Sequence, residues 1–141
     1  MKILAVLSFL SLAFIGCEKE SVMPVSDVPT EILSYVETHF PQSTISRAVK
    51  DKEFKSVSYE ITLTGGLYLE FNDDKKVVEI KGVNQLPNSV IPSAILEYTM
   101  ANFPNYYIIA WEIDDRKQQV TFNSGLELEF SMSGDFLRVD Y

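Results

Sequence analysis

An internal repeat limits the fold of this chain more than any other feature of its sequence. Residues 28–35, which read VPTEILSY, return as residues 91–98, which read IPSAILEY. The dipeptide FP at residues 40–41 returns at residues 103–104, again 63 positions later. Matched blocks in the same order at the same spacing indicate a duplication, in which each copy is one small supersecondary unit.

A second matched block lies further along each copy. Residues 66–71, which read GLYLEF, return 59 positions later as residues 125–130, which read GLELEF. The shorter spacing means that the first copy holds four residues more than the second, and we place them in a loop around residues 51–56. The repeat therefore divides the chain into a first copy, residues 28–84, and a second copy, residues 85–141.

Each copy is predicted to begin with a helix. Pro29 and Pro92 suit a first helical position, because the backbone N–H there would be unpaired anyway and the proline φ is already helical. Both helices should end at the Phe-Pro dipeptides, because the residue before a proline is pushed out of the α region. An apolar stripe marks one side of the first helix. It consists of Ile32, Leu33, Val36 and Phe40.

Strands are predicted after each helix. Apolar and polar residues alternate over residues 57–63, a Gly65-Gly66 turn follows, and the alternation resumes over residues 67–71, which indicates a hairpin. A period of two also indicates a sheet with one covered face and one face open to solvent. The other strands are expected near residues 45–50 and 77–81 in the first copy, and near residues 107–113, 120–122, 126–130 and 136–141 in the second.

These elements predict an α+β fold, a tandem repeat of one helix followed by a four-stranded antiparallel sheet (α-β-β-β-β twice). A copy of about 60 residues buries little core alone, so we expect residues 28–141 to form one structural unit. The two copies could join edge to edge as one long sheet, or they could share a core between them. We favour the continuous sheet, with both helices packed on one face.

The N-terminus predicts export. Residues 1–16 hold a single charge, Lys2, followed by an apolar run that is typical of a secretory signal peptide and too short to span a bilayer stably. The run ends at Cys17, and the stretch resembles a bacterial lipobox, in which a small residue precedes the cysteine that receives the lipid. Because Cys17 is the only cysteine, it has no partner for a structural disulfide. The alternative is an ordinary signal peptide that happens to contain a cysteine.

Cleavage before Cys17 would leave a lipid-anchored protein of the cell envelope. Residues 17–27 lack periodicity and contain a proline, so we expect a flexible tether between the lipid and the domain. We expect the anchor in the outer membrane, with the domain facing the periplasm or the cell surface. The net charge of the chain is −8, and loss of Lys2 makes the remainder more negative. Such a surface repels phosphate backbones, so no nucleic acid is expected as a partner.

The proline-led helices, the Phe-Pro stops and the GLxLEF hairpins, the second of which ends at residues 134–137 (GDFL), resemble the PepSY-like lipoproteins of Bacteroidetes. That family is also described as β-lactamase-inhibitor-like. The resemblance covers residues 28–141, and it implies an α+β domain of tandem repeats in the cell envelope. It carries no catalytic residues over to this chain, and it makes inhibition of a peptidase or β-lactamase an analogy only.

The sequence contains no recognisable catalytic set. The single histidine, His39, ends the first predicted helix, where a histidine more often caps the last carbonyls than catalyses. The pairs Asp73-Asp74 and Asp114-Asp115 lack the alternating oxygen ligands of a calcium loop, and they suit hairpin turns. We therefore expect no enzymatic activity, no metal site and no cofactor.

Four aromatic residues form the predicted partner-binding site. Tyr68 should point outward between inward leucines, and Tyr106, Tyr107 and Trp111 cluster on one strand, where neighbours cannot all face inward. Exposed Tyr and Trp often anchor protein interfaces, although Trp111 could equally be core while the tyrosines cover sheet edges. We therefore predict a non-enzymatic envelope lipoprotein that binds a protein or peptide partner through the open sheet face, in an inhibitor-like or adaptor role. The alternatives are a structural or stress-response envelope protein without a discrete partner and a hydrolase with an unrecognised site.

Overall fold

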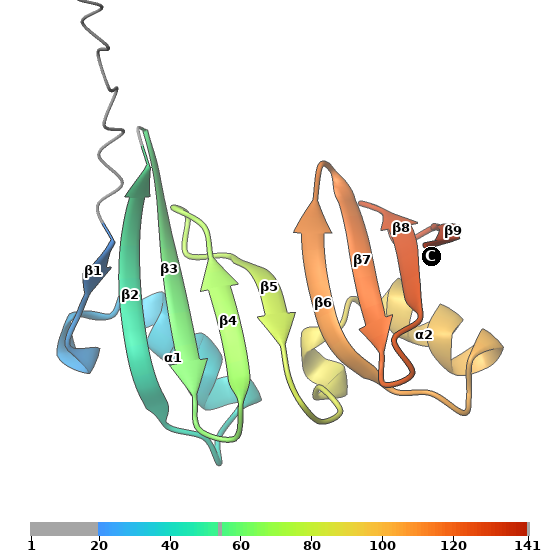
Figure 1. Cartoon of the computed structure of the whole chain (residues 1–141), viewed down its shortest axis with the longest axis horizontal. Coiled ribbons are helices and arrows are strands. Elements are labelled where there is room, and N and C mark those ends of the chain that lie inside the picture. The colour runs from blue at the N-terminus through green and yellow to red at the C-terminus, as the bar shows by residue number, and fades with distance from the viewer. Residues whose placement is uncertain (1–19, 54, 141) are drawn as a thin grey trace, which may run out of the picture.

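The computed structural model describes residues 20–53 and 55–140 of the chain. Its main feature is a nine-stranded antiparallel sheet, in which the strands lie side by side in the order of the sequence (Figure 1). The strands are β1 (Ser21–Val22), β2 (Ile45–Glu53), β3 (Ser56–Leu63), β4 (Leu67–Phe71), β5 (Val77–Lys81), β6 (Ile108–Asp114), β7 (Lys117–Phe122), β8 (Glu127–Ser131) and β9 (Phe136–Asp140).

This architecture differs from the predicted α+β fold of two helix-plus-four-strand copies, and that prediction is wrong. The nine strands form one sheet, whereas the two α-helices hold only ten residues each, so the fold is mostly β. The prediction overestimated the share of helix in the fold, because the proline signals that mark the helix ends are strong and local. It also missed β1, whose two residues carry no alternation. The continuous sheet itself agrees with the edge-to-edge arrangement that we favoured over a shared core.

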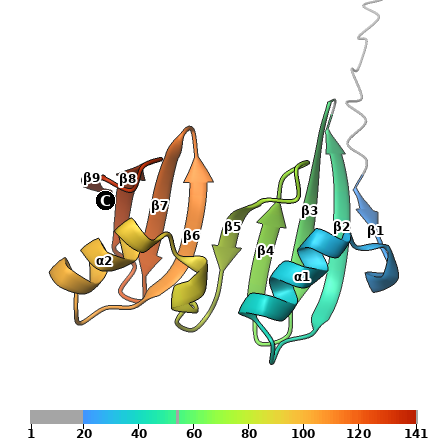
Figure 2. The ribbon, with the colours of Figure 1, turned by 180° about the vertical axis from the view of Figure 1, so that it is seen from behind.

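Two helices, α1 (Thr30–His39) and α2 (Ser93–Asn102), lie on the same side of the sheet (Figure 2). Pro29 and Pro92 are the N-cap residues, so each helix begins one residue later than predicted. Both helices end directly before their Phe-Pro dipeptides, as predicted. The proline signals therefore account for where each helix begins and ends.

The four extra residues of the first copy lengthen a hairpin and do not form the loop that we expected around residues 51–56. Strands β2 and β3 hold 9 and 8 residues, whereas β6 and β7 hold 7 and 6. The β2–β3 hairpin consequently extends beyond the neighbouring part of the sheet (Figure 1). Residues 51–53 belong to β2, and residue 56 is the first residue of β3.

The hydrophobic core lies between the sheet and the helices. Ile61 of β3 and Leu69 of β4 are fully buried, as are Ile32 of α1 and Ile95 of α2. These strand residues alternate with polar ones, as the period of two predicted. Each buried Leu or Ile contributes about 1.5–3 kcal/mol through the apolar surface it removes from water. Both helices cover this face, and the polar residues of the alternation lie on the opposite one.

The segment expected to form the tether is partly structured. Strand β1 pairs with the edge of β2, and η1 (Val25–Asp27) forms a short 3₁₀ helix. The structured part therefore begins before residue 28, and any flexible tether is shorter than the predicted residues 17–27. Cys17 and the predicted signal peptide lie outside the described residues.

Candidate functional site

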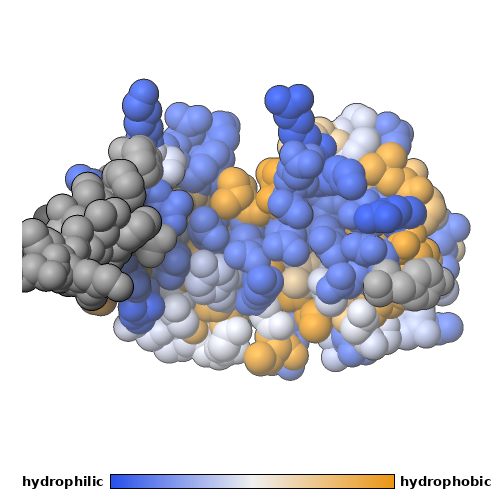
Figure 3. Space-filling view, turned by 45° about the horizontal axis from the view of Figure 1, so that its top comes forward, coloured by the Kyte–Doolittle hydropathy of each residue, from blue (hydrophilic) through white to orange (hydrophobic). Residues whose placement is uncertain are grey.

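The face of the sheet that points away from α1 and α2 carries the polar residues of the strands. Glu60 precedes the buried Ile61 in β3, and Glu70 follows the buried Leu69 in β4, so both glutamates point to the side opposite the core. Figure 3 shows part of this side of the molecule, and hydrophilic side chains predominate there. We call this surface the open face.

Four glutamates form a row across four neighbouring strands of the open face. Glu60 of β3 lies directly opposite Glu70 of β4, Glu70 lies opposite Glu79 of β5, and Glu79 lies opposite Glu112 of β6. Side chains directly opposite on one face have Cβ atoms about 4.5–5.5 Å apart, and like charges at such positions destabilise a sheet. We call these four residues the glutamate row.

Two members of the glutamate row, Glu70 and Glu112, bind protons more tightly than free glutamates do. Burial raises the pKa of Glu70, and the charges of Glu79 and Glu60 raise it further. Burial also raises the pKa of Glu112, and a hydrogen bond with Glu79 adds to the effect. Both shifts mean that negative charge is unfavourable at these two positions. Positive charge supplied from outside would be favourable there.

Lys81 and Tyr68 flank the glutamate row. Lys81 of β5 forms a hydrogen-bonded ion pair with Glu79, and this contact raises the pKa of Lys81. Tyr68 lies directly opposite Lys81 and donates its hydroxyl to Oε2 of Glu70 at 3.5 Å. Burial raises the pKa of Tyr68, and Glu70 raises it further, so the phenol stays a neutral donor. Lys81 offsets part of the negative charge, and the row as a whole remains anionic.

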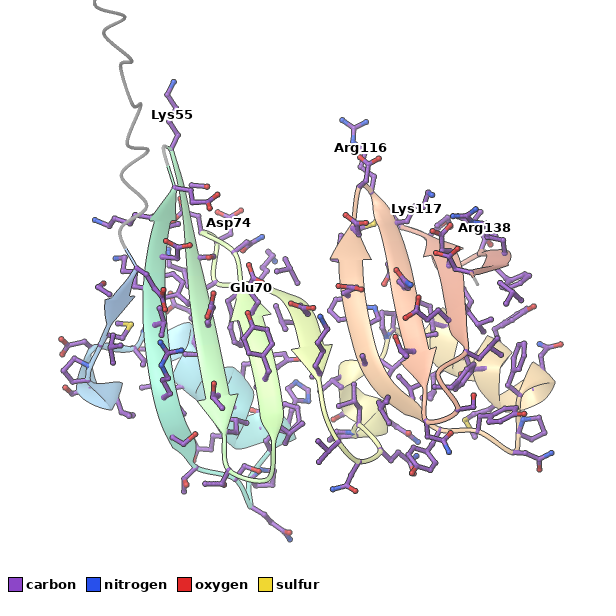
Figure 4. All side chains as sticks on the ribbon, viewed as in Figure 1. Lys55, Glu70, Asp74, Arg116, Lys117 and Arg138 are labelled. Carbon is purple, nitrogen blue, oxygen red and sulfur yellow. The ribbon has the colours of Figure 1, made fainter. Side chains whose placement is uncertain are left out.

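The same line of residues continues across β7, β8 and β9, where the carboxylate in the line is paired with cationic side chains. Gln119 lies opposite Glu112, Glu129 lies opposite Gln119, and Arg138 lies opposite Glu129. Arg138 donates to both Glu129 oxygens, from Nε to Oε2 at 2.7 Å and from Nη2 to Oε1 at 3.0 Å, and Lys117 donates at 3.2 Å. These donors lower the pKa of Glu129 to about 2, and the hydrogen bonding by Arg138 has the largest effect. Lys117 and Arg138 both lie at this end of the face (Figure 4), where the carboxylate is already neutralised.

A hollow of about 360 Å³ lies beside the glutamate row, between the β2–β3 hairpin and the β4–β5 turn. Its lining includes Asp51, Glu70, Asp73 and Asp74, and Glu70 and Asp74 are labelled in Figure 4. Oδ1 of Asp51 is buried and accepts no hydrogen bond from any described residue. A buried polar atom without a partner is costly. The hollow is therefore a second place on the open face where an N–H donor or a cation would be favourable.

The four aromatic residues that we predicted as one site do not come together. Tyr68 lies on the open face, as predicted. Trp111 is only 5% exposed and belongs to the core, where its Nε1 donates to Oε1 of Gln118 at 3.1 Å. Tyr106 and Tyr107 precede β6 and line a groove on the helix side of the molecule. The position of Trp111 agrees with the alternative that it is a core residue, and the two tyrosines lie on a different surface from Tyr68. A partner-binding role for the tyrosines stays a prediction.

His39 does not take the capping role that its position predicted. Its Nδ1 forms a hydrogen bond of 2.9 Å with Oγ of Ser89, which links α1 to the 3₁₀ helix η2 (Asn88–Val90), and its ring lies 4.4 Å from that of Tyr35. Among the residues that the structure describes, no group of three or more His, Cys, Asp or Glu side chains is arranged to hold a metal ion. Within the same residues, no helix has the length and apolar character needed to cross a membrane.

Comparison with known families gives one match over most of the chain. A family model described as "Putative beta-lactamase-inhibitor-like, PepSY-like" matches twice, over residues 14–79 and residues 57–138. This is the family that the helix and hairpin motifs resemble, so that prediction is confirmed. No curated protein matches the chain.

Three solved structures from Bacteroides share the fold. A protein of the DUF2874 family from Bacteroides vulgatus, described as periplasmic, is 25% identical with a TM-score of 0.83, and the match covers 89% of this chain and 100% of the other. A second periplasmic protein from B. vulgatus, described as of unknown function, is 28% identical with a TM-score of 0.81, over 87% of this chain and 100% of the other. A protein from Bacteroides thetaiotaomicron, described as calcium-regulated and periplasmic, is 24% identical with a TM-score of 0.81. The match covers 86% of this chain and 97% of the other. At that identity the last likeness shows the fold alone.

Proposed function

The chain belongs to the PepSY-like, β-lactamase-inhibitor-like family, and from this membership we propose that it is a non-enzymatic binding protein of the cell envelope. Its partner is a protein or peptide held on the open face of the sheet. The periplasmic descriptions of its structural neighbours are consistent with the cell envelope. The family description names an inhibitor-like protein, which supports a role exerted through binding. Anchoring in the outer membrane through a lipid on Cys17 remains part of this proposal.

The glutamate row is the observation that carries the proposal. Like charges that face each other across neighbouring strands cost stability, and burial first, then the neighbouring carboxylates, raises the pKa values of Glu70 and Glu112. Lysine or arginine side chains of a partner would relieve the repulsion and gain charge complementarity, which gives specificity and a fast association rate. We therefore assign the open face a partner segment rich in Lys or Arg.

The row extends over β3–β6, which suits an extended segment crossing the strands. Glu60 lies at one end and Glu112 at the other, with Oδ1 of Asp51, which no described residue pairs with, in the adjoining hollow as a further acceptor. Strand β7 continues the line with the neutral Gln119, and the Glu129 carboxylate after it is already bound by Arg138. The favourable positions for cations therefore end at β6.

Divalent cations are the competing ligand class. The B. thetaiotaomicron protein is described as calcium-regulated, and carboxylates are ligands that calcium prefers. In the described part of this chain, however, no three such side chains are placed to hold one ion. Carboxylates spread over four successive strands suit several cationic side chains better than a single metal ion. Calcium is accordingly a competitor to include in each binding experiment.

Two matched triple variants test the proposal in envelope extract. Changing Glu70, Glu79 and Glu112 to Gln removes three charges from the open face, and changing the exposed Glu31, Glu37 and Glu97 to Gln removes three charges from the helices. Proteins captured by the wild type should be retained by the helix variant and lost from the open-face variant. Equal retention by both variants would contradict the assignment of the open face.

A further inference from the structure

A groove of about 400 Å³ lies on the helix side of the molecule, away from the open face. Its walls come from the segment between β5 and α2, from α2 itself, and from the loop that joins α2 to β6. The size falls within the range of about 300–1,000 Å³ that is usual for ligand sites. We call it the α2 groove.

Among the residues that the structure describes, none that lines the α2 groove is charged. This is notable in a chain with 20 acidic and 12 basic residues and a net charge of −8. A charged group that entered would lose hydration without gaining a counter-ion, which is unfavourable. The lining therefore selects for an uncharged ligand.

An apolar floor and an exposed apolar rim shape the α2 groove. Leu86 and Phe122 are only 2% and 1% exposed and form part of the floor. At the rim, Met100 is 62% exposed, Tyr106 45% and Tyr107 40%. Methionine and tyrosine adapt to, or anchor, apolar side chains at binding surfaces. An aliphatic or aromatic side chain fits this lining.

Backbone bonds hold the walls of the α2 groove in place. Tyr107 and Asn123 are tied twice, from Tyr107 N–H to Asn123 Oδ1 at 3.1 Å and from Asn123 N–H to the Tyr107 carbonyl at 3.0 Å. The Leu86 N–H bonds to the Ile108 carbonyl at 2.9 Å, and the Tyr106 ring packs on Phe122 at 5.8 Å. A pre-formed site loses less entropy when a ligand binds.

Three side-chain amides stand at the same groove. Gln85, Asn88 and Asn105 line it, are exposed to solvent and are not bonded through their side chains to other described residues. Each amide offers both a donor and an acceptor. That combination matches the N–H and C=O groups of a peptide backbone, which carry no charge.

From these observations we propose that the α2 groove binds an uncharged peptide segment, with one apolar side chain of the segment seated on the floor and its backbone paired with the amides. This site is independent of the open face. The protein would then contact a peptide chain on each side of the sheet, through charge on one side and through apolar contact on the other.

Methyl-labelled methionine in the full-length protein tests the proposal directly, since the chain has four methionines. Met100 lies in the groove, and Met132, which is 51% exposed, lies outside it and serves as the matched reference. The probe is a blocked tripeptide, acetyl-Ala-Leu-Ala-amide, titrated into the labelled protein. Saturable shifts of the Met100 methyl signal are expected, with the Met132 signal unchanged.

Two comparisons decide the outcome. Met100→Lys should weaken binding of the tripeptide at least tenfold, whereas Met132→Lys should leave it unchanged. Replacing the central Leu of the tripeptide by Lys or Glu should abolish the Met100 shift. The proposal is overturned if the Met100 signal does not move, if the charged peptides shift it equally, or if the two Met variants bind alike. A shift with leucinol but not with the tripeptide would also overturn it, because the site would then take a small apolar molecule and not a peptide.

Discussion

Glu79 of β5 lies directly opposite Glu112 of β6, at the strand pair that joins the first five strands of the sheet to the last four. Two carboxylates therefore meet at the junction, with Glu70 and Glu60 continuing the line on one side. Behind them, on the core side, Ile80 pairs with Trp111 and both are buried. The junction thus gains its stability from the apolar face, while the open face carries an electrostatic cost that we connect with partner binding.

The free energy of unfolding should rise as the pH is lowered from 7 towards 5. The pKa values of Glu70 and Glu112 are raised in the folded protein, so their contribution is complete at low pH and is lost as the pH rises through the folded values. Urea unfolding at a series of pH values measures the effect. A Glu70→Gln, Glu112→Gln double variant should show a flatter profile over the same range. A wild-type stability that falls from pH 7 to pH 5 would contradict the assignment.

Glu129 should make the opposite contribution at lower pH. Its pKa is lowered to about 2 in the folded protein, so the stability it provides is present above the unfolded value and is lost as the pH falls towards 2. Glu129→Gln should lower the urea midpoint at pH 7, because Arg138 and Lys117 lose their shared acceptor. It should also remove part of the acid-dependent loss. An unchanged midpoint would show that this network is not stabilising.

Neutralising one member of the glutamate row should stabilise the protein. Glu70→Gln keeps an acceptor for the Tyr68 hydroxyl and removes the repulsion from both neighbours, so we expect a gain of about 0.2–1 kcal/mol at pH 7. Glu37→Gln, on the exposed side of α1, should change stability far less. Equal effects of the two variants in urea unfolding would mean that net charge, and not the row, is responsible.

Trp111 should matter for stability and not for binding. Trp111→Ala should cost about 3–5 kcal/mol, the usual range for a large core residue. Trp111→Phe should keep the fold, lose the bond to Gln118 and retain the partner captured by the wild type. If a folded Trp111→Phe variant no longer captured the partner, Trp111 would have a role in binding, which would contradict this prediction.

Gly134 should tolerate a side chain less well than Gly65. Both have a positive φ, +92° and +86°, so alanine pays a similar backbone cost at each position. A Cβ at Gly134 would meet the Cβ of Ala94 in α2 at 2.7 Å, whereas one at Gly65 meets nothing within 4 Å. Gly134→Ala should therefore be less stable than Gly65→Ala by about 1–3 kcal/mol. Equal urea midpoints would show that α2 shifts freely on the sheet.

Local signals in the sequence predicted the elements well. The proline-led starts and Phe-Pro stops place both helices to within one residue, because proline acts on its own backbone and on the residue before it. Strand β5 has the predicted bounds, residues 77–81. Strand β1 was missed because two residues cannot show an alternation, and its pairing with β2 depends on tertiary structure.

The candidate site was predicted less well, because it depends on register. A bulge between Ile108 and Ala110 in β6 changes the alternation, so Ile108 and Trp111 both face the core although they are three residues apart. Trp111 is therefore separated from Tyr106 and Tyr107, which precede β6 and line the α2 groove. The alternation over residues 67–71, which places Tyr68 outward, implies the same side for Glu70, but only the pairing of β4 with β5 and of β5 with β6 brings Glu79 and Glu112 into line with it.

The affinity for a lysine-bearing peptide tests the central claim most directly. A labelled peptide of alternating Lys and Ser, titrated by fluorescence anisotropy at low salt, should bind the wild type and the Glu31, Glu37, Glu97→Gln variant alike. It should bind the Glu70, Glu79, Glu112→Gln variant at least tenfold more weakly, and binding to the wild type should weaken as salt is added. Equal affinities for the two variants, which carry the same net charge, would show that the peptide follows overall charge and that the glutamate row is not a binding site.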